Sequence, residues 1–193
     1  MPSSVRVLAF AGSTRRDSFN KKLVKIAAAA ARAAGAEVTE IDLANLPLPL
    51  FDHDLEAAEG QPANAVTLKR LMREHDGFLI AAPEYNSSIT GVLKNAIDWA
   101  SRRSADEEPL VAFAGKTAAL MSASPGALGG LRGLVHVRSI LGNLRVLVLP
   151  EQRAISRAAT AFDDNGHLVE VSEQTAIEAL GRRLVEVTEK LRA

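Results

Sequence analysis

Apolar residues are grouped along this chain into continuous runs of strand length. Four runs, bounded by polar or turn residues, read VRVLAFAG from Val5, GFLIAAP from Gly77, TAALMSAS from Thr117 and LRVLVLP from Leu144. Continuous rather than alternating hydrophobicity is typical of strands buried on both faces of a parallel sheet. A fifth segment, EVTEID from Glu37, alternates and is expected to be an edge strand.

The stretches between these runs repeat apolar residues every three or four positions, which predicts helices that bury one face. The repeats cover residues 23–34, 68–75, 89–100, 134–144 and 177–191. Strands and helices therefore alternate, and this pattern predicts a three-layer α/β sandwich with right-handed crossovers. No domain boundary is indicated, so we expect residues 1–193 to form a single domain.

The connection that follows the alternating segment is unusually long. It reads LANLPLPLFDHDLEAAEGQPAN from Leu43 and contains three prolines with no clear period. Its length exceeds that of most connections, which favours a functional surface loop over a linker. The pattern leaves the role of residues 43–62 open.

Composition limits the chemistry that the chain can perform. Lys and Arg number 23, as do Asp and Glu, so no global field favours binding to nucleic acid or to an acidic membrane surface. The sequence contains no cysteine, so thiol nucleophiles and disulfides are excluded and redox chemistry requires a bound cofactor. The N-terminal MPSSVRVLAF has too short an apolar run for a signal peptide or a membrane span, so we expect a cytoplasmic protein.

The loop after the first predicted strand, GSTRRDSFN at residues 12–20, offers a site for an anion. Ligands of open parallel sheets bind beyond the carboxyl ends of the strands. Gly12 permits a tight turn, the hydroxyls and the start of the next helix can donate hydrogen bonds, and Arg15 can pair with phosphate oxygens. The alternative is that Ser18 only caps the helix and the arginines are solvated. The loop has neither a P-loop motif nor GxGxxG, which disfavours a dinucleotide across this turn.

Two later loops follow strands that should end at the same edge of the sheet. In PEYNSSITGVLKNAIDW from Pro83, an aromatic ring at Tyr85 lies beside polar groups, which suits a planar heterocycle unless Tyr85 is a packing residue. In SASPGALGGLRG from Ser122, four glycines let the backbone approach a ligand closely, unless the loop is only a flexible turn.

The three loops together resemble the NADPH-dependent FMN reductase family of flavodoxin-like quinone, azo-dye and chromate reductases. The first loop matches GSxRxxSxN without a gap, and the second matches PEYNxSxxGxLKNAIDW. SPGALGGLRG with the following VHVRSILGNLRVLVLP resembles the third segment of the family. The resemblance implies a flavodoxin-like three-layer sandwich with a five-stranded parallel sheet in the order 2-1-3-4-5.

The resemblance also implies which residues bind FMN. Those around its phosphate or ribityl chain would be Ser13, Arg15, Ser18, Phe19 and Asn20; those along the isoalloxazine would be Pro83, Glu84, Tyr85 and Asn86, with Ser122 and Ser124 at the other edge. No side chain is assigned as catalytic, and no metal site is expected. The Asp-His-Asp run from Asp52 is too compact to place three side chains around one ion.

The family resemblance implies that NADPH or NADH reduces the flavin, which then reduces a small-molecule acceptor such as a quinone, azo compound, chromate or free flavin. A flavodoxin-type FMN electron carrier that does not oxidise NAD(P)H is the alternative, and a noncatalytic nucleotide-binding domain is a third hypothesis. Neutral net charge and an arginine-bearing phosphate loop weigh against the carrier. The preference between NADPH and NADH stays open, with Arg16 as the free candidate for an extra phosphate.

The resemblance implies a homodimer or homotetramer with the helix from Ile89 near the subunit contact. Trp99 lies at the margin of the apolar stripe of that helix. It is either part of a partner surface or a tryptophan at the edge of the core, and the sequence leaves both open.

Overall fold

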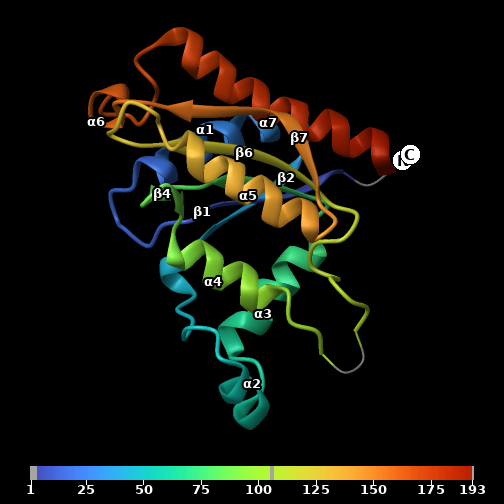
Figure 1. Ribbon diagram of the computed structural model, residues 1–193. Helices are drawn as coiled ribbons and strands as arrows, with labels where there is room; N and C mark the ends of the chain where they lie inside the picture. The colour runs from blue at the N-terminus through green and yellow to red at the C-terminus, as the bar shows by residue number, and fades with distance from the viewer. Residues whose placement is uncertain (1–3, 105–106, 193) are drawn as a thin grey trace.

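The computed structural model describes residues 4–104 and 107–192, which are built around a five-stranded parallel sheet (Figure 1). Its strands are β1 (Arg6–Ala11), β2 (Glu37–Asp42), β3 (Gly77–Ala81), β6 (Thr117–Ala123) and β7 (Leu147–Ile155). They lie in the order β2-β1-β3-β6-β7, and all four pairings are parallel. With β6 and β7 as the fourth and fifth strands, this order confirms the predicted flavodoxin-like topology.

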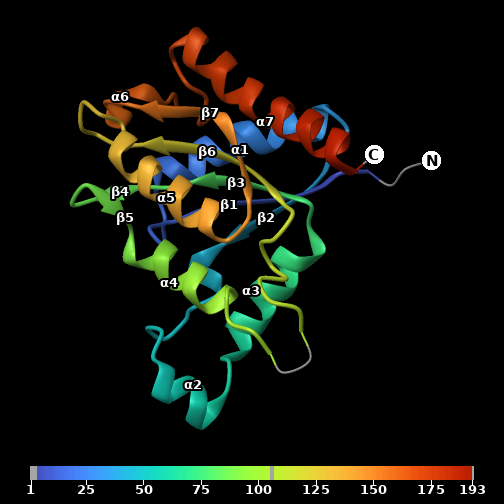
Figure 2. The ribbon, with the colours of Figure 1, turned by 45° about the vertical axis from the view of Figure 1, so that its right-hand side comes forward.

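Helices cover both faces of the sheet and form the outer layers of the sandwich (Figures 1 and 2). The long helices are α1 (Phe19–Ala33) and α7 (Val171–Arg192) on one face, and α3 (Ala63–Glu74), α4 (Gly91–Ala100) and α5 (Leu131–Asn143) on the other. The three-layer architecture is therefore confirmed.

Alternate residues of each central strand serve the two apolar layers. In β1, Val7 and Ala9 pack in the cluster under α1 and α7, whereas Leu8 and Phe10 pack in the cluster under α3, α4 and α5. All five residues of β3 and all seven of β6 are buried. Burial on both faces explains why these strands appear in the sequence as continuous apolar runs.

Two element boundaries differ from the prediction. Leu144 ends α5 as its C-cap, and the last strand begins only at Leu147 after Arg145 adopts a positive φ of 64°. The fourth helix begins at Gly91 rather than at Ile89, because Thr90 is its N-cap and its hydroxyl accepts a hydrogen bond from the Leu93 N–H. Ile89 instead belongs to a short hairpin formed by β4 (Glu84–Tyr85) and β5 (Ser88–Ile89).

The long connection contains a 3-10 turn at Leu43–Asn45 and a helix, α2 (His53–Glu59), which projects from the sandwich in Figure 1. Asp52 caps α2 by accepting hydrogen bonds from the N–H groups of Asp54 and Leu55, which explains the Asp-His-Asp run. A short helix, α6 (Ala158–Ala161), lies between β7 and α7.

Trp99 fastens this connection to α4. Its side chain is fully buried, and its Nε1 donates to the Pro49 carbonyl oxygen at 2.8 Å. Asn95 donates to the same carbonyl oxygen and accepts from the Phe51 N–H, and the Phe51 ring packs edge-on against Trp99. Of the two roles open for Trp99, the core position is therefore the one observed.

Within residues 4–104 and 107–192, no helix is long and apolar enough to cross a membrane. The same residues contain no group of three or more His, Asp or Glu side chains placed to hold a metal ion.

Candidate functional site

The first loop begins where β1 ends, and its start is held beside β3 and α4. The Gly12 N–H donates to the Ala81 carbonyl oxygen at 2.9 Å, and the Thr90 hydroxyl donates to the Gly12 carbonyl oxygen at 2.7 Å. A Cβ at Gly12 would lie 2.8 Å from the Leu93 Cβ, so only glycine allows this approach. The first and second loops are thus joined at the carboxyl edge of the sheet.

The start of α1 lacks a side-chain cap. Ser18 occupies the N-cap position with extended backbone, but its hydroxyl accepts no hydrogen bond from the helix. Ser13 and Ser18 are both buried, whereas Thr14, Arg15 and Arg16 are exposed. The simple alternative, in which Ser18 serves as a helix cap, is therefore not observed. Because the Ser18 side chain does not cap the first turn, backbone N–H groups there can donate hydrogen bonds to a bound anion.

Arg15 is held over the loop rather than extended into solvent. Its guanidinium donates to the Asp17 carbonyl oxygen and lies 5.3 Å from the centre of the Phe19 ring. The Phe19 ring in turn stacks on Phe162 with centroids 6.0 Å apart. The Arg15 backbone N–H donates separately to the Ser13 hydroxyl at 3.3 Å, which holds the turn of the first loop.

Asn20 connects the first loop to the end of β6. Its buried amide donates to the Ala123 carbonyl oxygen at 2.8 Å and accepts from the Ala123 N–H at 3.0 Å. Both hydrogen-bonding groups of the side chain are therefore used to hold the two loops together. This geometry makes Asn20 a positioning residue of the site.

The second loop forms the β4–β5 hairpin. Asn86 and Ser87, the two residues between the strands, have positive φ angles of 50° and 66°. Positive φ at both central positions is the geometry of a type I′ turn, which fits the twist of a hairpin. Tyr85 is 61% exposed on this hairpin, so its ring is available as a surface rather than packed in the core.

Glu84 ties the hairpin to the start of α5. Its carboxylate accepts from Arg132 Nε at 2.8 Å and from the Gly133 N–H at 3.1 Å. Burial of Glu84 opposes its ionisation, but the hydrogen bonds from Arg132 and Gly133 outweigh burial and lower the pKa of the carboxyl group. Glu84 is therefore a carboxylate at neutral pH, directed toward α5.

The third loop approaches the hairpin through glycines. Gly130 has a φ of 95°, and a Cβ there would lie 1.9 Å from the Ser122 hydroxyl. Ser122 is fully buried, and its hydroxyl has no hydrogen-bond partner in the described part of the chain. Ser124 is partly exposed and accepts from the Gly126 N–H at 3.3 Å. A buried hydroxyl that no protein group pairs is unusual, and the Ser122 hydroxyl can therefore form a hydrogen bond with a ligand without losing one to the protein.

Each of the three loops is thus bonded to the others: Thr90 joins the first and second, Asn20 joins the first to the end of β6, and Glu84 joins the second to the start of α5. Together they present an uncapped helix start, an exposed aromatic ring and an unpaired hydroxyl at one edge of the sheet. Residues 5–160 match the family described as NADPH-dependent FMN reductase. The chain belongs to this family. It is an oxidoreductase, with FMN as its cofactor and NAD(P)H as its reductant.

Individual relatives agree with this assignment. The chain is 37% identical over 171 residues to an NAD(P)H-dependent FMN reductase of Pseudomonas aeruginosa, covering 88% of each protein. It is 39% identical over 153 residues to a quinone reductase of Escherichia coli, covering 77% of this chain and 76% of the relative. Among solved structures, the flavoenzyme NAD(P)H:(acceptor) oxidoreductase FerB of Paracoccus denitrificans superposes with a TM-score of 0.80 at 29% identity, covering 96% of this chain and 98% of that one.

Two residues that hold the three loops together were not predicted. Thr90 precedes the helix of the second motif, and a threonine before an apolar repeat is a recognisable N-cap signature. Arg132 lies in the first turn of α5, 48 residues from its partner Glu84, so no local pattern could indicate the pair.

Proposed function

We propose that the three loops hold FMN and that the protein uses it to pass electrons from NAD(P)H to a quinone. One observation carries this proposal: three loops are hydrogen-bonded to one another at a single edge of the sheet. They bring together the uncapped start of α1, the hairpin with Tyr85 and the loop with Ser122. The name of the Escherichia coli relative supports a quinone as acceptor. When bound, FMN supplies the hydride and electron transfer that no side chain of the protein can perform.

The residues at the site fit the parts of FMN. Ser13, Ser18, Arg15 and the first turn of α1 supply hydrogen-bond donors and one positive charge, which suit a phosphate. The Arg15 guanidinium lies over the Phe19 ring, and this contact helps to hold it in place. We assign the phosphate end of FMN to this loop.

The isoalloxazine is assigned to the hairpin and the third loop. Pro83 and Asn86 would offer backbone, Tyr85 its exposed ring, and Ser124 a partly exposed edge. Glu84 would act indirectly, because its carboxylate is already bonded to Arg132 and Gly133. In this proposal the protein positions and shields the flavin, and none of its side chains acts as a nucleophile or proton donor.

We also propose that the protein is a homodimer that covers the apolar surface beside the hairpin. Tyr85, Leu128, Leu131 and Val135 are large apolar side chains exposed on the hairpin, the third loop and the start of α5. Val135 is 58% exposed, and Val92 adds an exposed apolar side chain on α4. Exposed apolar groups of this size are characteristic of surfaces that bind a partner. Sedimentation of the wild type and of Val135→Asp would test the dimer, with a shift to monomer expected for the variant.

The redox function is tested by adding NADPH or NADH anaerobically to the FMN-loaded protein. Bleaching of the flavin absorbance, followed by its return when a quinone is added, is expected. A protein that binds FMN but does not bleach with either nucleotide would instead be an electron carrier. Steady-state rates with a quinone, an azo dye, chromate and free flavin would then rank the acceptors, and a quinone rate below the others would overturn the acceptor assignment.

A further inference from the structure

A tight turn at residues 162–168 follows α6 and lies beside the start of α1. Its first and last residues, Phe162 and Leu168, form an antiparallel bridge. The Asp163 carboxylate accepts from the His167 N–H at 2.8 Å, and the Asp163 N–H donates to the His167 carbonyl oxygen at 2.9 Å. We call this segment the Phe162 turn. Its internal hydrogen bonds give Phe162 a fixed position relative to the rest of the turn.

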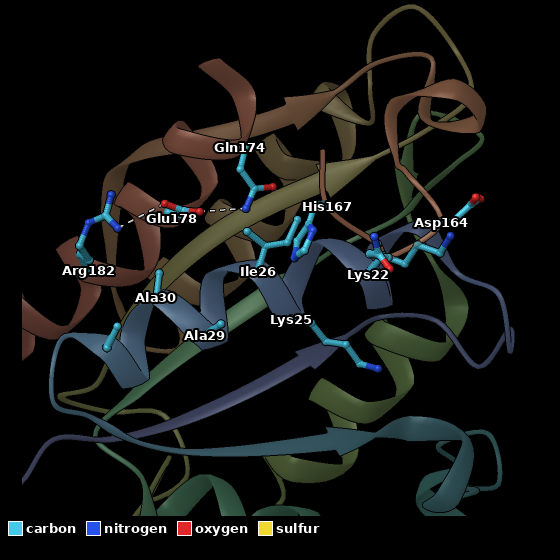
Figure 3. Close-up of a pocket in the computed structure, with 13 residues that line it drawn as sticks. Lys22, Lys25, Ile26, Ala29, Ala30, Asp164, His167, Gln174, Glu178 and Arg182 are labelled. Carbon is cyan, nitrogen blue, oxygen red and sulfur yellow. Dashed lines mark hydrogen bonds and ion pairs between the residues drawn. The ribbon is translucent and has the colours of Figure 1, made fainter. Parts of the chain in front are cut away.

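The tip of the Phe162 turn borders a hollow of about 620 Å³ between α1 and α7 (Figure 3). The residues that line this hollow come from the turn, from α1 and from α7, and they include Asp164, His167, Lys22, Lys25 and Gln174. Since the tip faces open space, the turn is attached at its base. There Leu168 is buried in the core, and Phe162 packs at the margin of the core.

Phe162 joins the turn to the first loop through stacked aromatic rings. Its ring is nearly parallel to that of Phe19, with 6.0 Å between the centroids and 7° between the planes. Each ring also has a cation over it. The Arg15 guanidinium lies 5.3 Å from the centre of the Phe19 ring, and Lys22 Nζ lies 5.8 Å from the centre of the Phe162 ring. Both distances are those of a cation–π contact.

Apolar burial alone does not require aromatic residues at positions 19 and 162. Both rings are only half-buried, at the margin of the core under α1 and α7, where leucine would also bury its side chain. An aromatic pair provides in addition a flat face of fixed orientation, on which a guanidinium can stack. The Phe162 ring restricts the Phe19 ring, and the Phe19 ring in turn restricts Arg15.

We propose that Phe162 is a positioning residue for FMN: by stacking on Phe19, it orders the ring that carries Arg15 and so prepares the guanidinium to bind the phosphate. The inference rests on the proposed function, since it takes the first loop as the phosphate site. Phe162 lies beyond residues 5–160, which match the family, so the motifs shared with the family do not include it. A side chain that is already ordered loses less conformational entropy when it binds a ligand, which raises the affinity.

The test is a double-mutant cycle on FMN affinity, measured by flavin fluorescence. Phe162→Leu keeps an apolar side chain but removes the ring, and it should raise the dissociation constant of FMN about two- to five-fold, the size of an exposed cation–π contact. In the Arg15→Ala background, the same substitution should have no further effect, because both residues act through one contact. Phe162→Tyr keeps the stacked ring and should bind FMN as tightly as wild type does.

Riboflavin, which has the ring system of FMN but no phosphate, separates positioning of Arg15 from general damage to the site. Wild type and Phe162→Leu should bind riboflavin equally, whereas a distorted first loop would bind both flavins more weakly. Phe113→Leu is the matched control. It removes a ring from the aromatic pair with Phe78 on the other face of the sheet, so it should lower the stability in urea without changing the FMN affinity.

Two results would overturn the positioning role. One is an unchanged FMN affinity in Phe162→Leu, or a loss of equal size with and without Arg15. The other is an equal loss for FMN and riboflavin, which would give Phe162 a structural role only. An FMN affinity that does not change in Arg15→Ala would instead defeat the phosphate assignment of the proposed function. If neither NADPH nor NADH reduces the FMN-loaded wild type, the redox function fails, and the cycle still measures the role of Phe162.

Discussion

Glu84 and Arg132 form an ion pair that joins the β4–β5 hairpin to the first turn of α5, with Arg132 Nε 2.8 Å from the carboxylate. The Glu84 side chain is 7% exposed and that of Arg132 is 56% exposed, so the pair has one buried and one solvated end. The same carboxylate also accepts from the Gly133 N–H. The hairpin is thus fixed by a buried anion at a helix start, an arrangement that stabilises both elements.

Glu84→Gln should destabilise the fold in a pH-dependent way. The folded-state pKa of Glu84 lies below its ordinary value of 4.5, so its stabilising contribution is fully present above that value and is lost as the pH falls through the folded-state pKa. We expect the variant to lose roughly 1 to 2 kcal/mol of unfolding free energy at pH 7, at the low end because Arg132 is solvated. Urea unfolding at several pH values should show the difference from wild type shrinking below pH 4.5. Glu74→Gln, which breaks an exposed pair with Arg70, is the control; a Glu84→Gln difference that did not vary with pH would contradict the assignment.

Asn20→Ala should weaken the junction between the first loop and β6. The substitution leaves the buried N–H and carbonyl oxygen of Ala123 without partners, which is expected to lower the unfolding free energy by about 2 to 3 kcal/mol. Asn64→Ala removes a single, more exposed hydrogen bond to Pro47 and should have a much smaller effect. Thermal and urea unfolding measure both. Equal losses in the two variants would show that the double contact of Asn20 is not special.

The sequence predicts the strands, which follow from hydrophobic periodicity, and the place of the candidate site, which follows from where the strands end. Continuous apolar runs identify the strands because β3 and β6 are buried on both faces, and the three loops were correctly expected at one edge of the sheet. What holds those loops together could not be predicted. The partners of Asn20 and Glu84 are 103 and 48 residues distant, and contacts over such separations leave no local pattern.

The long connection was harder to predict for a different reason. Its prolines suppress the helical period, although Asp52 carries the N-cap signature of α2. Its attachment through Asn95 and Trp99 also shows why the second motif has these residues on α4. Part of a sequence motif that resembles a flavin-site signature therefore serves to anchor a neighbouring loop.

Gly130→Ala should disrupt the third loop. The backbone has a φ of 95°, and the new Cβ would lie 1.9 Å from the Ser122 hydroxyl, so both strain and overlap oppose the substitution. We expect roughly 2 kcal/mol or more of lost stability. Gly91→Ala, which has open space around its Cβ, is the matched control and should be nearly neutral or stabilising. Similar stabilities for the two variants in urea unfolding would show that Gly130 is not constrained.

Ser122→Ala separates the structural and ligand roles of the buried hydroxyl. Without FMN, the variant should be as stable as wild type, because the hydroxyl has no partner in the described chain that its removal would leave unpaired. It should also partly rescue Gly130→Ala, since the closest atom to the new Cβ is removed while the Ser122 Cβ stays 2.9 Å away. A loss of FMN affinity in Ser122→Ala, measured by flavin fluorescence, is expected if the hydroxyl pairs with the flavin. Unchanged affinity would remove Ser122 from the site.

Arg15→Ala should weaken FMN binding more than it weakens the fold. The guanidinium is exposed and held by Phe19 and the Asp17 carbonyl oxygen, so its removal disturbs little packing while it takes away a positive charge of the first loop. Loss of one charge-assisted hydrogen bond to a phosphate, worth about 1.5 to 3 kcal/mol, corresponds to a rise in the FMN dissociation constant of about 10-fold or more. Arg15→Lys keeps the charge but not the bidentate geometry and should lie between wild type and Arg15→Ala. Arg70→Ala, an equally charged substitution on α3, should leave FMN affinity unchanged. Fluorescence titration measures all three, and an Arg15→Ala affinity equal to that of wild type would move the phosphate away from the first loop.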